Sequence, residues 1–139
     1  MTQLACRYAL VRFMPHSDAE EFVNIGIVVA CPQTGFFGFR LEAQKHKRVT
    51  DFFEGLSPEM YSAAVLVMSG ELERVKRQLE RQQGDDIAAR TRALFEGVTH
   101  AREAQVKFSK ARVALADSPE AELDRLYKHY VDRTSPTSV

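Results

Sequence analysis

The strongest constraint on the fold is a ten-residue run from Phe22 to Cys31 that is almost entirely apolar and rich in branched side chains. Such a composition favours a β-strand over a helix. With the two-residue period of a strand, one face would carry Val23, Ile25, Ile27, Val29 and Cys31. We predict that this run is the central strand of a sheet.

A second apolar run, Phe36–Leu41, follows after the turn-forming residues PQTG, and the two runs together predict a β-hairpin. The register that keeps the apolar residues of both strands on one face pairs Val29 with Phe37. The same register puts Gly26 opposite Arg40 on the second face. We therefore expect the second face to be small and partly polar.

Helices are predicted in the middle and at the end of the chain. A short helix should end near Gly55, and a long amphipathic helix should start after Ser57 and run to about Gln83, with a bend or division at Gly70. Its apolar stripe would be Met60, Ala64, Met68, Leu72, Val75 and Leu79.

The rest of the chain supplies three more strands or extended pieces and two more helices. A strand is expected at Tyr8–Met14, a short helix after Asp85 or Asp86, and extended pieces on either side of a break near Ser109. A final helix would begin at Ser118, with a stripe of Leu123, Leu126, Tyr127, Tyr130 and Val131.

This order of elements predicts an α+β fold. We expect a small antiparallel sheet of three to five strands with helices packed on it, including the long amphipathic helix and the C-terminal helix. The 139 residues are enough for one domain, which we place at residues 1–133, followed by a flexible tail at 134–139.

Composition narrows the class of protein. The 19 basic residues balance 19 acidic ones, so no overall field would attract nucleic acid or an acidic membrane surface. Cys6 and Cys31 form no zinc or redox motif and are expected to be reduced. Without a secretory leader or an apolar span of about 20 residues, we expect a soluble, cytoplasmic protein with no cofactor or metal.

The residues from Pro15 to Gly26, with Glu21, Asn24, Ile25 and Gly26 among them, resemble the pattern of a bacterial family known as domain of unknown function 3037. The segment from Phe108 to Val131 resembles the same family. The resemblance implies no activity, but members of this family look like genomic neighbours of kinases similar to HipA. It therefore implies a protein partner more than a reaction.

Polar and small residues inside the apolar strand are the first site candidates, because they depart from strand preferences. In a purely structural interpretation, Asn24 satisfies backbone groups at a bulge and Gly26 admits a helix or Arg40 close to the sheet. In a functional one, Asn24, Gly26, Gly38 and Arg40 form a shallow patch that clamps a partner's carboxylate or phosphate. Arg7 or Arg12 would enlarge it, and the predicted partner-binding residues are Glu21, Asn24, Gly26, Arg40 and Arg12.

We predict a non-catalytic interaction module or accessory subunit, with two alternatives. The first is a metal-dependent enzyme of nucleic-acid or phosphate chemistry, which would use Arg12 and Arg40 with His16, Asp18, Glu20 or Glu21. The second is a nucleic-acid-binding regulator associated with phage or defence systems, which needs one shared surface for Lys45, Lys47, Arg48, Lys107, Lys110 and Arg112.

Overall fold

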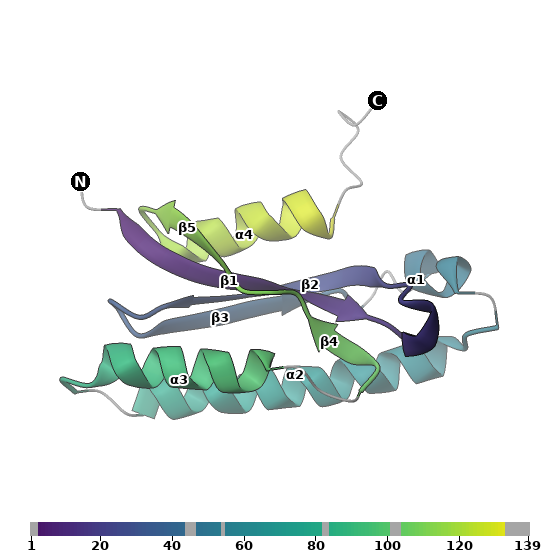
Figure 1. Ribbon diagram of the computed structural model, residues 1–139, viewed down its shortest axis with the longest axis horizontal. Helices are drawn as coiled ribbons and strands as arrows, with labels where there is room; N and C mark the ends of the chain where they lie inside the picture. The colour runs from purple at the N-terminus through teal and green to yellow at the C-terminus, as the bar shows by residue number, and fades with distance from the viewer. Residues whose placement is uncertain (1–2, 44–46, 54, 82–83, 101–103, 133–139) are drawn as a thin grey trace.

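The computed structural model describes residues 3–43, 47–53, 55–81, 84–100 and 104–132. It is an α+β fold in which one antiparallel sheet lies between two layers of helices (Figure 1). The strands are β1 (Leu4–Phe13), β2 (Val23–Cys31), β3 (Phe36–Leu41), β4 (Val106–Phe108) and β5 (Arg112–Ala116). The helices are α1 (Lys47–Phe52), α2 (Pro58–Arg81), α3 (Ile87–Thr99) and α4 (Pro119–Tyr130), with a short 3-10 turn at Ser17–Ala19. The predicted tail at 134–139 lies outside the described residues.

The sheet has the strand order β3-β2-β1-β4, and β5 also pairs with β1. β4 pairs with the end of β1 and β5 with its beginning, so the two short strands share one side of β1. The predicted break between them is confirmed. At that point the backbone N–H of Leu10 donates to Ser109 Oγ at 2.8 Å, and the N–H of Ser109 donates to the carbonyl of Leu10 at 2.9 Å.

Each face of the sheet has its own core. On the first face, α1, α2 and α3 pack against residues such as Val11, Phe13 and Ile25. On the second face, α4 packs against Leu10 and Ile27 (Figure 1). Because β1 and β2 contribute to both cores, these two strands are buried on both sides.

The predicted single stripe on β2 is wrong. β1 pairs Val11 with Gly26 but Arg12 with Asn24, so β2 carries one extra residue, Ile25, at a β-bulge. Ile25 therefore faces the first core, whereas Ile27 and the alternate residues after it face the second. The alternation of a strand changes phase at a bulge, and the apolar pattern alone did not show where.

The predicted hairpin register is also wrong, by one residue. The structure pairs Val29 with Gly38 and Ile27 with Arg40, so Gly26 lies opposite Leu41. Alternation could not decide the register because both faces of β2 are apolar and covered. The second face is accordingly an apolar core under α4 rather than a small, partly polar surface.

The long helix α2 starts as predicted, with Ser57 Oγ accepting a hydrogen bond from the N–H of Met60 at 3.2 Å, and it continues through Gly70 without interruption. Its first turns are rotated relative to the prediction, since Met60 is exposed. Tyr61 takes the buried place because its ring packs edge-on against Phe13 at 5.1 Å. The buried face is Tyr61, Val65, Met68, Leu72, Val75 and Leu79.

α4 begins at the predicted cap, where Ser118 Oγ accepts a hydrogen bond from the N–H of Ala121 at 3.3 Å. Its residues Leu126 and Tyr127 enter the second core as the sequence predicts. Within the described residues, no helix is both long and apolar enough to cross a bilayer.

Candidate functional site

β3 is an edge strand with its outer side open between two helices. It stands at the end of the strand order, so in the described part of the chain only β2 pairs with it. The N–H of Glu42 donates to the carbonyl of Ile25 at 2.7 Å. In an antiparallel pair every second residue bonds to the neighbouring strand, so this bond determines which residues of β3 bond to β2. By that alternation Gly38 and Arg40 bond to β2, and Phe37 and Phe39 turn their N–H and C=O groups outward.

A groove of about 500 Å³ runs along this open edge. Its floor is the stretch from Gly35 to Phe39, α2 supplies one wall, and α4 supplies the other. The view in Figure 1 shows β3 between these two helical layers. The helical side chains that line the groove are Lys76 and Glu80 from α2 and Glu120, Leu123 and Asp124 from α4.

The rim of the groove is negatively charged. Three of its side chains are carboxylates and one is an ammonium, that of Lys76. Asp124 Oδ1 accepts a hydrogen bond from Arg40 Nη1 at 2.8 Å, but Glu80 and Glu120 have no ion-pair partner within the described ranges. Glu80 and Glu120 together with the ammonium of Lys76 thus leave the groove with a net negative charge beside open backbone groups.

Of the predicted residues, Arg40 lies on β3, and Gly26 lies on β2 opposite Leu41 of β3. The guanidinium of Arg40 lies 4.2 Å above the ring of Tyr127 and is held there by its ion pair with Asp124. Gly26 is buried and has a packing role: a Cβ at this position would lie 2.5 Å from the carbonyl oxygen of Arg40. The predicted close approach at Gly26 is therefore confirmed, and the approaching group is the β3 backbone.

Arg12 and Asn24 lie together elsewhere, on the second face beyond α4, as register partners on β1 and β2. The predicted five-residue patch is therefore divided between two places. Glu21 is exposed two residues before β2 and lies outside both. The bulge predicted for the Asn24 region is confirmed, but the prediction that Asn24 satisfies backbone groups there is not met by its Oδ1, which accepts no hydrogen bond from the described residues.

Sequence reasoning missed Glu42, a carboxylate that is only 6% exposed. The hydroxyl of Tyr61 donates to its carbonyl, and the hydroxyl of Tyr127 lies 3.5 Å from its Oε2. Burial, and next the Glu42 carboxylate, raises the pKa of Tyr127 to about 12. A glutamate directly after a strand looks like a solvated residue, so only the fold could show that it links α2 to α4.

The two alternative functions depend on a metal-binding group and on a shared basic surface. Among the described residues, no three His, Cys, Asp or Glu side chains are grouped so as to hold a metal ion. Of the six predicted basic residues, Arg48 donates from Nη2 to the carbonyl of Asn24 at 2.9 Å, and Lys107 pairs in register with Arg12. Lys45 and the side chain of Lys47 lie outside the described part of the chain.

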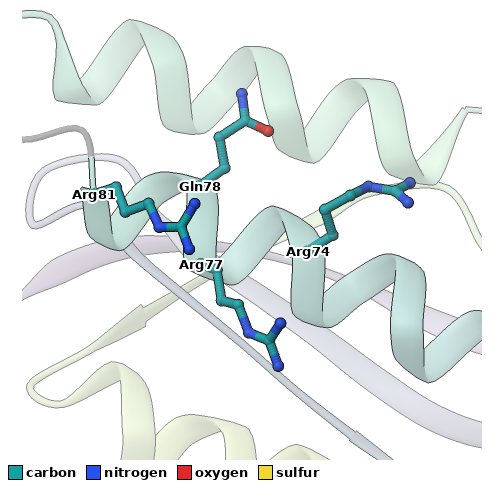
Figure 2. Close-up of a pocket in the computed structure, with 4 residues that line it drawn as sticks. All are labelled: Arg74, Arg77, Gln78 and Arg81. Carbon is teal, nitrogen blue, oxygen red and sulfur yellow. The ribbon is translucent and has the colours of Figure 1, made fainter.

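A further basic surface lies on the outside of α2, where Arg74, Arg77, Gln78 and Arg81 line a hollow of about 320 Å³ (Figure 2). In Figure 2 the three guanidinium groups spread apart along the helix instead of converging on one point. Arg77 Nε lies 3.7 Å from Glu73 Oε1, four residues earlier on the same helix. This geometry is that of a solvated helix face.

Comparison with known proteins gives one match. Residues 8–131 match the model of a family described as Protein of unknown function (DUF3037). No curated protein and no solved structure matches the chain.

Proposed function

The chain belongs to the DUF3037 family, and from the open edge of β3 we propose that it is a non-catalytic interaction module that binds a protein partner in the cytoplasm. The observation that carries this proposal is the groove between α2 and α4 with unpaired strand groups on its floor. A partner segment in extended conformation would add a strand to the sheet at this edge.

The backbone of the edge would supply the affinity. A strand laid about 4.8 Å from β3 would exchange hydrogen bonds with the outward N–H and C=O groups of Phe37 and Phe39. Its alternate side chains would point toward α2 on one side and toward Leu123 of α4 on the other.

Charge would supply the selectivity. Since Glu80 and Glu120 have no partner in the described chain, the groove favours a segment that carries lysine or arginine beside its apolar residues. The first partner to test is a HipA-like kinase, which the resemblance of the sequence implies. In its most specific form, the proposal is that the chain is an accessory subunit of such a kinase.

The proposal is tested in two stages. Tagged protein is first purified from its native cell, and protein and nucleic acid in the eluate are both identified. Backbone amide exchange of the free and bound chain is then compared by NMR. Strand addition predicts slowed exchange at the amides of Phe37 and Phe39. A partner that leaves both amides unprotected contradicts it, and stoichiometric nucleic acid without a protein supports the regulator alternative.

Rim variants test the charge argument. Glu80→Arg combined with Glu120→Gln should weaken binding of the purified partner at least tenfold, which corresponds to about 1.4 kcal/mol. The matched control is Glu59→Gln, which removes a charge from the first turn of α2, away from the groove. If the rim variant binds as tightly as the control, the partner does not use this groove.

A further inference from the structure

Three polar side chains form a row across the second face of the sheet, beyond the end of α4. Arg12 of β1 pairs in register with Asn24 of β2 and with Lys107 of β4. Cross-strand partners share a face, and the neighbours of this row, such as Val11 and Phe13, point into the first core. We call Asn24, Arg12 and Lys107 the polar row.

The positive charge of the polar row is uncompensated. Within the part of the chain that the structure describes, neither Arg12 nor Lys107 has an ion-pair partner. Burial, and next the nearby charge of Arg112, lowers the pKa of Arg12 below its ordinary value. Arg112 itself donates from Nη1 to the hydroxyl of Tyr130 at 3.3 Å, at the end of α4. Three cations therefore gather with no described carboxylate bound to them.

Two buried atoms of the polar row lack a hydrogen-bond partner, namely Arg12 Nε and Asn24 Oδ1. Buried polar atoms are hydrogen-bonded in the great majority of cases, so these two atoms on neighbouring strands are exceptions to that rule. The ring of Phe22 lies 4.2 Å from Arg12 Cζ and covers one face of the guanidinium. Stacking of this kind holds the plane of the guanidinium, so its terminal N–H groups keep a fixed direction.

We infer that the polar row, with Arg112, binds a single phosphate group of a phosphate monoester. Arg12 would donate two parallel N–H bonds to the phosphate oxygens, and Lys107 and Arg112 would offset the remaining charge. The Asn24 side chain, which presents either its oxygen or its NH2 group by rotating about its last bond, would complete the contacts. The two negative charges of a phosphate monoester offset the charge of three cations better than the single charge of a carboxylate does.

This site goes beyond the proposed function, because the polar row lies on the sheet face and not at the β3 edge. A nucleic acid is a weaker candidate than a phosphate monoester. A polynucleotide needs a track of cations that follows its backbone, whereas the polar row is short and the chain carries no net charge.

The test titrates the full chain with inorganic phosphate and with O-phosphoserine, using NMR signals of the Arg12 Nε–H and the Asn24 side-chain amide at constant ionic strength. Both ligands should give saturable shifts, and the affinity should fall as the pH falls below about 6, where the phosphate takes up its second proton. Acetate should give no saturable shift. An equal response to acetate, or no saturation by either phosphate at millimolar concentration, overturns the assignment.

Variants separate the site from general electrostatics. Arg12→Gln should lower the affinity for O-phosphoserine at least tenfold, and Lys107→Gln should lower it several-fold while leaving the fold intact. The matched control is Arg74→Gln on the outer face of α2, which should bind like the wild type. A single-stranded oligonucleotide that binds far more tightly than O-phosphoserine, and through Arg12, would overturn the phosphate-monoester assignment in favour of a nucleic-acid surface.

Discussion

At the scale of single residues, Gly26 and Gly70 both lack a side chain inside a regular element, the first in a strand and the second in a helix. The two glycines differ in their surroundings. A Cβ on Gly26 would lie 2.5 Å from the carbonyl oxygen of Arg40, a backbone atom that cannot turn away. A Cβ on Gly70, in the exposed face of α2, would meet nothing within 4 Å. One glycine is required by close packing of strands, and the other only weakens a helix.

We predict opposite effects of the same substitution at these two glycines. Gly26→Ala should lower the free energy of unfolding by about 1–3 kcal/mol, because β3 must move away from β2. Gly70→Ala should raise it by about 0.5–1 kcal/mol, because alanine is the better helix former. Urea unfolding followed by circular dichroism measures both. A Gly26→Ala variant as stable as the wild type would show that β3 is not held close to β2.

Two buried residues, Cys6 and Tyr127, should make the folded state less stable at alkaline pH. Burial, followed by the neighbouring Cys31 thiol, raises the pKa of Cys6 from its ordinary value of 9.0 to about 11. Tyr127 shifts in the same direction, to about 12. Above pH 9 the unfolded chain loses these protons while the native chain keeps them, so the unfolded state binds fewer protons and stability falls as the pH rises.

Unfolding in urea at pH 8 and at pH 10.5 measures this loss. In the Cys6→Ala variant combined with Tyr127→Phe, the decrease between the two pH values should be smaller than in the wild type, whatever the stability of the variant at pH 8. An equal decrease would mean that other groups cause the alkaline sensitivity.

At the scale of elements, the sequence predicted most helices and strands but not how β2 and β3 face the cores. Caps such as Ser57 and Ser118 mark helix starts by local chemistry, and local chemistry can be read from the chain. The phase of β2 depends on an extra residue, Ile25, whose position is set by pairing with β1. When both sides of a strand are apolar, alternation carries no information about which side each residue takes.

The candidate site also has some residues that the local sequence can predict and others that it cannot. Asn24 and Gly26 were identified because they are unusual residues in a strand, but the bulge and the register separated Arg12 from Arg40 in space. The open edge of β3 and the buried Glu42 had no local signal. Both arise from the order of strands and from helices distant in sequence.

The cap of α4 provides a test at the element scale. Ser118→Ala removes the acceptor for the N–H of Ala121 and should lower the free energy of unfolding by about 1 kcal/mol. Ser62→Ala, on the exposed face of α2, is the control and should stay within about 0.5 kcal/mol of the wild type. Thermal or urea unfolding suffices. Equal stability of the two variants would show that the cap contributes nothing.

At the scale of the whole molecule, the two cores cannot be independent, because β1 and β2 supply residues to both. Glu42 adds a second link, since it contacts Tyr61 of α2 through its carbonyl and lies beside Tyr127 of α4. We therefore expect a single cooperative transition on unfolding.

Tyrosine fluorescence tests this expectation. Of the four tyrosines, Tyr61 lies in the first core, and Tyr8, Tyr127 and Tyr130 lie in or against the second. Tyr61→Phe therefore leaves only reporters on the second core. The triple variant Tyr8→Phe, Tyr127→Phe and Tyr130→Phe leaves only Tyr61 to report on the first. Within each variant, the urea midpoint from fluorescence should equal the midpoint from far-ultraviolet circular dichroism. A fluorescence transition at lower urea in the variant that retains Tyr127 would mean that α4 detaches before the rest unfolds.

The open edge of β3 has a consequence for the chain when it is alone. An unpaired strand is a template on which a second copy can pair and begin to aggregate. If two copies met edge to edge about a twofold axis, the acidic rim of one would face the acidic rim of the other, and Glu80 and Glu120 would oppose the contact. The carboxylates that favour a basic partner would thus also keep the unoccupied protein from binding itself.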